Sequence, residues 1–96
     1  MVRHVVVWKK SENYTPEKGE RAKRELEALV GRIEGLLWLE VTFDTITQGD
    51  IVLDSNFKDE AALDYYMEHP LHKAAGAFTK EITKDRRAVD WIIGHA

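Results

Sequence analysis

The sequence predicts an α+β fold of the ferredoxin-like class, in which a four-stranded antiparallel sheet follows the order βαββαβ and the second helical region is split in two. Two observations support this prediction. Apolar residues alternate in four segments and recur at helical spacing in the segments between them. The connections are short, so right-handed crossovers leave a split βαβ sandwich as the simplest topology. The first and third strands would then be central, and the second and fourth would be the edges.

The first half of the chain contains two predicted strands around one predicted helix. Residues 2–9 are rich in valine, as strands are, and one face of this segment would carry Val2, His4, Val6 and Trp8. Thr15 and Pro16 suit the N-cap and the first turn of a helix, and Gly35 suits its end. In residues 37–43, Leu37 and Leu39 begin an alternating pattern on one face, so a second strand is expected there.

The second half of the chain has the order strand, helix, strand. The turn-forming residues 48–50 (Gln-Gly-Asp) precede an apolar segment at 51–57, which would form a hairpin with the second strand. Asp59 starts a helix that breaks at Pro70, because a proline disfavours helical backbone in the residue before it. His69 then takes a capping position, and a new helix continues through Ile82. Residues 87–93 form the fourth predicted strand.

Length and composition indicate one globular domain spanning residues 1–96. The chain has no cysteine, which excludes disulfides and thiol nucleophiles. Its formal net charge is −3 and basic residues are interleaved with acidic ones in the first helix, so nucleic-acid binding is not expected. No apolar run reaches the roughly 20 residues that cross a bilayer, and no signal sequence is evident, so we expect a cytoplasmic protein without membrane contact.

The predicted sheet has more apolar surface than its own helices can cover. The first and fourth strands are apolar on both faces, while both helical regions lie on one side of a split βαβ sheet. A large exposed apolar face usually marks an interface. We therefore expect a homodimer in which two sheets meet face to face through their open faces and enclose a barrel-like interior. Three tryptophans on strands are candidate anchors of this interface: Trp8, Trp38 and Trp91.

Four segments, in this order along the chain, resemble the stress-responsive A/B barrel (Dabb) family of dimeric α+β barrels. They are MVRHVVVWK, GDIVLDSNF, LDYYMEHPLHKAAGAF and RAVDW, and the resemblance extends over nearly the whole chain. The resemblance implies a homodimer with a cleft or cavity between the sheet and the helices. It does not imply one particular activity, since members of the family differ in what they do.

One kind of member, the plant olivetolic acid cyclase, closes a polyketide chain by an aldol reaction. The resemblance to it implies that His72, the second histidine of HPLH, and Tyr66, six residues earlier, are candidate catalytic residues, and that His4 matches its first-strand histidine. Two further polar positions of that cyclase correspond to Ile51 and Leu26 here. Cyclase activity therefore does not carry over with the resemblance. Related α+β barrels also include small monooxygenases.

Each candidate side chain has a functional and a structural interpretation. His72 lies in the first turn of a helix, where the macrodipole favours a neutral imidazole that can act as a general base; alternatively, it packs under the loop. The hydroxyl of Tyr66 could polarise a carbonyl group, or its ring could fill the layer between sheet and helix. His4 is either a ligand contact in the cavity or a structural hydrogen-bonding residue.

Three functions are consistent with these residues. The first is a small-molecule-binding dimer, whose cleft would hold an apolar or carbonyl-containing ligand between Val6, Trp8, Ile51 and Leu53. The second is an enzyme of the cyclase or lyase type with His72 as base, or a cofactor-free small monooxygenase. The third is a structural, stress-associated dimer without chemistry.

No cofactor or metal is predicted. His69 and His72 are three residues apart, but zinc sites use three or four protein ligands and the nearest carboxylate, Glu68, is off that helix face. His95 is predicted to belong to the C-terminal tail.

Overall fold

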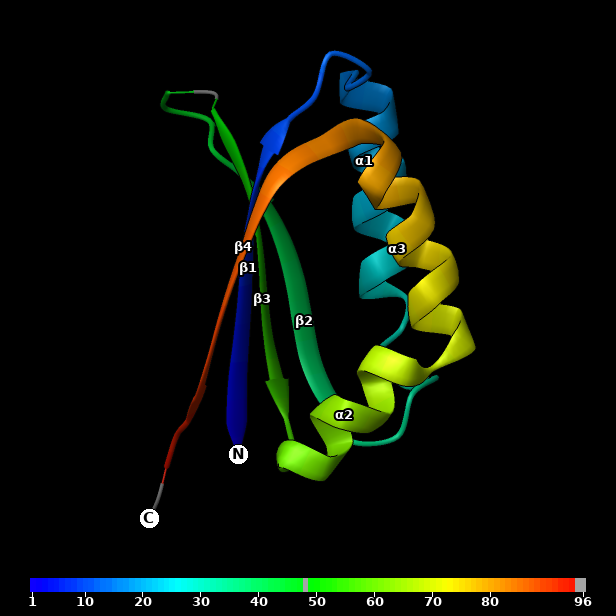
Figure 1. Cartoon of the computed structure of the whole chain (residues 1–96), viewed down its shortest axis with the longest axis vertical. Coiled ribbons are helices and arrows are strands. Elements are labelled where there is room, and N and C mark those ends of the chain that lie inside the picture. The colour runs from blue at the N-terminus through cyan, green and yellow to red at the C-terminus, as the bar shows by residue number, and fades with distance from the viewer. Residues whose placement is uncertain (48, 95–96) are drawn as a thin grey trace.

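Four antiparallel strands form one sheet, and three helices lie against one of its faces (Figure 1). The computed structural model describes residues 1–47 and 49–94; Gln48 of the predicted turn and His95 of the predicted tail lie outside the described residues. The strand order is β2-β3-β1-β4, which confirms the predicted ferredoxin-like α+β fold, its central strands and its edges. The elements are β1 (Val2–Lys10), α1 (Pro16–Glu27), β2 (Leu36–Phe43), β3 (Asp50–Phe57), α2 (Glu60–Glu68), α3 (Pro70–Ile82) and β4 (Thr83–Ile92).

One face of the sheet is buried beneath the helices because every second side chain of the two central strands points toward them. In β1 these residues are Val2, His4, Val6 and Trp8, as predicted. In β3 they are Ile51, Leu53, Ser55 and Phe57. Helices α1 and α2 add Leu26 and Tyr66 to the same core. Phe57 is 0% exposed and Tyr66 is 1% exposed, so both lie at the centre of the packing.

Trp8 belongs to this core. Its side chain is 9% exposed and lies on the same face as Val6, because alternate residues of a strand point to the same side. The prediction that Trp8 anchors a dimer interface on the open face is therefore wrong.

Helix α1 ends earlier than predicted. It stops at Glu27, well before Gly35, and residues 28–35 form consecutive turns. In these turns the N–H of Val30 donates to the carbonyl of Glu27, and Gly31 has a φ of 87°. A residue with left-handed backbone cannot continue an α-helix, so Gly31 prevents the extension that the apolar spacing suggested. Leu29 is still buried, as the predicted helical pattern required.

The edge strand β2 contains a bulge. Its pairing advances by two residues, from Leu36 to Trp38, while the pairing of β3 advances by one. Leu37 is the extra residue and is 49% exposed. The prediction that Leu37 shares the buried face of Leu39 is wrong, because a bulge shifts the alternation of side chains by one position.

The other edge strand, β4, contains a second bulge and begins earlier than predicted. Its pairing advances by three residues, from Arg87 to Lys84, while the pairing of β1 advances by two, from Val7 to Lys9. Asp85 lies within this bulge and has a φ of 53°. Left-handed backbone is uncommon for residues other than glycine, but aspartate adopts it more readily than most.

The break between α2 and α3 falls at the predicted position. His69 Nδ1 accepts a hydrogen bond from the N–H of Leu71 at 3.1 Å, so its imidazole caps α3. The carboxylate of Asp59 caps α2 in the same way, accepting from the N–H of Ala62 at 2.8 Å. Pro70 is the first residue of α3, where a missing N–H has no cost. The predicted capping role of His69 is confirmed.

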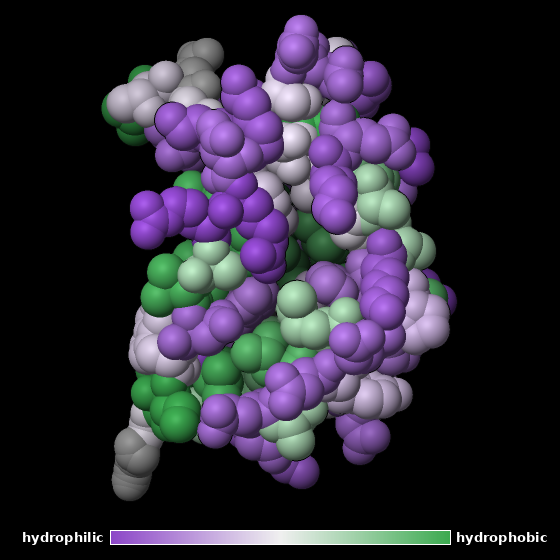
Figure 2. Space-filling view, viewed as in Figure 1, coloured by the Kyte–Doolittle hydropathy of each residue, from purple (hydrophilic) through white to green (hydrophobic). Residues whose placement is uncertain are grey.

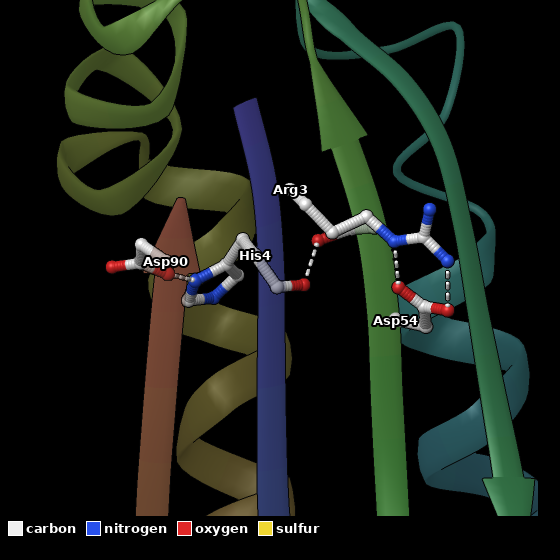
Figure 3. Close-up of polar contacts among 5 residues, drawn as sticks. Arg3, His4, Asp54 and Asp90 are labelled. Carbon is white, nitrogen blue, oxygen red and sulfur yellow. Dashed lines mark hydrogen bonds and ion pairs between the residues drawn. The ribbon is translucent and has the colours of Figure 1, made fainter. Parts of the chain in front are cut away.

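The second face of the sheet is open: among the described residues, no helix covers it (Figure 1). The register places Trp38, Arg3 and Trp91 in one row across this face, and these tryptophans are 40% and 44% exposed. Val89 lies in the next row and is 56% exposed. The guanidinium of Arg3 donates to both carboxylate oxygens of Asp54, at 2.6 and 2.7 Å, and this ion pair is drawn in Figure 3.

Candidate functional site

A cavity of about 780 Å³ opens between the helix-covered face of the sheet and the helices. Figure 2 shows hydrophobic surface inside this hollow and hydrophilic side chains around its mouth. A space of this size can hold a small organic molecule. Strands β1 and β3 and helices α2 and α3 line its inner part with Val6, Trp8, Leu53, His4, Tyr66 and His72.

Three aromatic side chains with polar atoms lie together on one wall. The rings of Tyr66 and His72 have centroids 4.1 Å apart, since Tyr66 lies in the last turn of α2 and His72 lies in the first turn of α3, across the capped break. The ring of His4 lies edge-on to Tyr66, with centroids 6.5 Å apart. Phe57 supports both, at 4.9 Å from Tyr66 and 6.1 Å from His4. The structure thus brings the three polar candidates of the sequence analysis to the same cavity.

His72 carries an unsatisfied nitrogen. Its Nδ1 is buried and makes no hydrogen bond of normal geometry with any described residue. Burial lowers the pKa of His72 below its ordinary value of 6.5; the hydrogen-bonding interaction with the backbone of Met67 opposes this change, and the electrostatic effects of His4, Arg86 and His69 add to it. The sequence analysis expected a lowered basicity from the helix dipole, whereas burial is the larger cause. A neutral imidazole at neutral pH can accept a proton or a hydrogen bond.

Tyr66 keeps its proton over the physiological range. Burial raises the pKa of its phenol well above the ordinary value of 10.0, although the nearby charge of Arg86 acts in the opposite direction. A protonated phenol facing a cavity can donate a hydrogen bond to a carbonyl oxygen. The hydroxyl of Tyr66 is therefore a hydrogen-bond donor on a ring that contacts the neutral imidazole of His72.

His4 is held by a residue that the sequence analysis did not single out. Its Nδ1 forms a short hydrogen bond with the carboxylate of Asp90, which lies opposite it in the pairing of β1 with β4 (Figure 3). Because an ionised carboxylate only accepts hydrogen bonds, Nδ1 carries the proton and Nε2 is the remaining ring nitrogen. The side chain of His4 is 5% exposed. The signal for Asp90 was a polar residue within the apolar RAVDW segment, but its partner depends on the strand register.

The apolar candidates are divided between two spaces. Val6, Trp8 and Leu53 line the main cavity. Ile51 does not; it lines a much smaller void of about 10 Å³, which Trp8 also reaches. Ile51 is thus placed on the predicted face but away from the three polar rings.

The described residues show no arrangement suited to a metal ion. No group of three or more histidine, aspartate or glutamate side chains is gathered at one point in residues 1–47 and 49–94. Within the same ranges, no helix is both long and apolar enough to cross a membrane.

Residues 2–93 match the sequence profile of the family described as the Stress Responsive A/B Barrel Domain, or Dabb. The chain belongs to the Dabb family. The match covers all the strands and helices of the structure and confirms the resemblance drawn from the sequence segments. No curated protein matches the sequence of this Dabb chain.

Solved structures with the same fold have sequences only distantly similar to this Dabb chain. A dimeric protein of unknown function with a ferredoxin-like fold from Bacteroides fragilis is 26% identical, with a TM-score of 0.78 over 96% of this chain and 95% of that one. A dimeric ferredoxin-like protein of unknown function from Thermobifida fusca is 24% identical, with a TM-score of 0.84 over 96% and 90%. A candidate antibiotic biosynthesis monooxygenase from Deinococcus radiodurans is 16% identical, with a TM-score of 0.81 over 100% and 95%.

Proposed function

We propose that this Dabb chain is a homodimer that binds a small apolar or carbonyl-containing molecule in the cavity between its sheet and its helices. The observation that carries the proposal is the cluster of His4, Tyr66 and His72 on the wall of an otherwise apolar space. Ligand sites in proteins combine a mainly apolar lining with a few polar groups that orient the ligand. We further propose that residues 1–96 act as one domain, in the cytoplasm and without a nucleic-acid partner.

The unsatisfied nitrogen of His72 supports a ligand in preference to a purely structural role. A buried polar atom without a partner costs about 1–3 kcal/mol. In this chain that atom belongs to a side chain that lines a cavity, next to the ring of Tyr66. A ligand with a hydroxyl group could donate to the imidazole of His72 while its carbonyl oxygen accepts from Tyr66. The proposal thus explains why His72 and Tyr66 are placed in contact.

The open face of the sheet supports the homodimer. Trp38, Val89 and Trp91 leave apolar surface on this face, and an exposed patch of this kind commonly marks an interface. A second copy of the chain is the occupant we propose, because the solved structures from Bacteroides fragilis and Thermobifida fusca are described as dimeric. Two such faces would stack as aligned sheets.

An enzyme of the cyclase or lyase type is the second candidate function. His72 would act as general base on a proton next to a carbonyl group, and Tyr66 would stabilise the resulting enolate by donating a hydrogen bond. The lowered pKa of His72 favours this reading, because the imidazole is then neutral and able to take a proton at neutral pH. A cofactor-free small monooxygenase stays a further candidate from the sequence analysis; the Deinococcus radiodurans neighbour, described as an antibiotic biosynthesis monooxygenase, has the same fold.

Nuclear magnetic resonance can test the ligand site directly. Acetophenone and acetylacetone are suitable probes, as an aromatic ketone and a small dicarbonyl. We expect the ring signals of His72 to shift on binding, and Tyr66→Phe to weaken binding by about fivefold, the value of one hydrogen bond. Tyr65→Phe is the matched control, since Tyr65 is 54% exposed and does not line the cavity. Equal effects of the two variants, or no shift of His72 with either probe, would refute the proposed site.

The same probes separate a binding protein from an enzyme. Exchange of the methyl protons of acetophenone with D₂O is slow without a base catalyst, and its rate can be followed by the loss of the methyl signal. If the chain is an enzyme of the proposed type, the wild-type protein should accelerate this exchange and His72→Phe should abolish the acceleration. If it only binds, the exchange rate should stay at its background value while the His72 signals still shift. A structural dimer without a ligand would show neither effect.

A further inference from the structure

The mouth of the cavity carries a charge opposite to that of the whole chain. The chain has 14 basic and 17 acidic residues, for a net charge of −3. The residues that line the cavity include four cationic side chains and only one carboxylate: Lys73, Lys80, Lys84, Arg86 and Asp85. The side chains that could balance these charges therefore lie elsewhere on the surface.

Three of the four cations have no ion-pair partner among the described residues. Lys73 is paired with Glu68 at 3.1 Å. The side chains of Lys80, Lys84 and Arg86 form neither an ion pair nor a hydrogen bond with any residue in the described part of the chain. A cleft with low-dielectric walls concentrates the field of such charges and raises the local concentration of anions.

The backbone of β4 brings two of these cations to the mouth. Residues Ala88 and Asp90 of β4 lie opposite Val6 and His4, so this side of the strand faces the helices. Arg86 continues the alternation on the same side. Lys84 lies beyond the bulge at Asp85, opposite Lys9, and also lines the cavity. Bulges commonly re-aim side chains next to functional sites.

Arg86 lines the same cavity as the polar rings of the inner wall. Its positive charge contributes to the lowered pKa of His72 and opposes the raised pKa of Tyr66. Deeper in the same cavity, Val6 and Leu53 provide apolar surface.

We propose that the ligand of this cavity is amphiphilic and carries a negatively charged head group, carboxylate or phosphate, which binds to Lys80, Lys84 and Arg86 while its apolar part lies against Val6 and Leu53. This inference rests on the proposed function, because it names the chemical class of ligand for the same cavity. Arginine can bind both oxygens of such a group, and lysine adds point charges.

A matched series of eight-carbon compounds tests the head group alone. Octanoate, octyl phosphate, 1-octanol and octylamine share one apolar chain and differ in charge. Binding is followed by the amide signals of Gly76 and Ala77, which line the cavity in α3. We expect at least one of the two anions to bind about fivefold or more tightly than octanol, as one exposed ion pair can provide. Added salt should weaken binding of that anion and leave octanol unchanged.

Two double variants with the same change in net charge locate the effect. Lys84→Gln with Arg86→Gln removes two cations from the mouth of the cavity. Arg32→Gln with Lys58→Gln removes two exposed cations that do not line it. The first pair should abolish the preference for the anion, and the second pair should leave it intact.

The outcomes distinguish the two proposals. Equal affinity for octanol and both anions, or a preference that survives Lys84→Gln with Arg86→Gln, would overturn the anionic head group and leave a neutral-ligand cavity standing. No change at Gly76 or Ala77 with any of the four compounds, together with no shift of His72 with the carbonyl probes, would overturn both. Tighter binding of octyl phosphate than octanoate would support the inference and identify phosphate as the group.

Discussion

Replacing Val89 by lysine tests the assembly through the open sheet face. Val89 is 56% exposed and lies opposite Val5 in the register of β4 with β1. Lysine is preferable to aspartate, because Arg87 lies on the same face of β4 and could neutralise a carboxylate. In a symmetric dimer the substitution occurs twice, once from each copy. The variant therefore places two unpaired ammonium groups in the proposed interface.

The expected size of the effect follows from this symmetry. Burying one unpaired charge costs several kcal/mol, and the flexibility of a lysine side chain reduces this to about 2 kcal/mol. Two copies give about 4 kcal/mol, which weakens the dimer roughly a thousandfold at about 1.4 kcal/mol for each factor of ten. The control is Ala88→Lys, which adds the same charge at the next residue, on the helix side of the strand opposite Val6.

Sedimentation equilibrium at micromolar concentration measures the effect. We expect the wild-type chain and Ala88→Lys to be dimers and Val89→Lys to be a monomer with a native circular dichroism spectrum. A monomeric wild-type chain would refute the dimer. Dissociation by Ala88→Lys but not by Val89→Lys would show that the chains meet through another surface.

Three further predictions concern stability, measured by urea unfolding. The pKa of His72 is lowered in the folded state, so the unfolded state binds a proton more readily as the pH falls. The free energy of unfolding should therefore keep its full value above the ordinary pKa of 6.5 and decrease below it. His72→Phe should remove the part of this decrease that His72 causes. Phe57→Ala should cost about 3–5 kcal/mol, because the ring is completely buried between His4 and Tyr66; a loss below 1 kcal/mol would contradict this packing. Gly35→Ala should be destabilising, because φ is 90° and the new Cβ would lie 2.5 Å from that of Ala62. Its control, Gly76→Ala in α3, should stabilise the fold by about 1 kcal/mol, because no atom lies within 4 Å of the new Cβ.

Much of the fold could be predicted because its signals are local. The alternation of Val2, His4, Val6 and Trp8 identifies the face of β1 that is buried, and the His69-Pro70 pair identifies the break between the helices. Backbone geometry that depends on a neighbouring strand was not accessible in this way. Leu37 looks like an ordinary strand residue and Asp85 lies before the predicted fourth strand, and their bulges exist only in the pairing with β3 and β1.

The candidate site was predicted in part for the same reason. Tyr66 and His72 were found through the family resemblance, and the structure shows that their rings are in contact. Asp90 and Arg86 were not identified from the sequence. The contact of Asp90 with His4, 86 residues away along the chain, and the place of Arg86 at the cavity both depend on the register of β4. Contacts between the two ends of a chain follow from topology rather than from spacing.

The extra residue in each edge strand also affects how copies of this protein can aggregate. A regular edge strand offers a row of free N–H and C=O groups to which a strand of another molecule can add. Here the bulges at Leu37 and Asp85 limit the regular part of each rim to residues 38–43 of β2 and 87–92 of β4, which shortens the template that each rim offers. A symmetric contact through the open sheet face is complete with two copies, whereas strand addition at an edge can repeat without closing and leads to fibres. Deleting Asp85 would therefore regularise one rim at the risk of insoluble polymer.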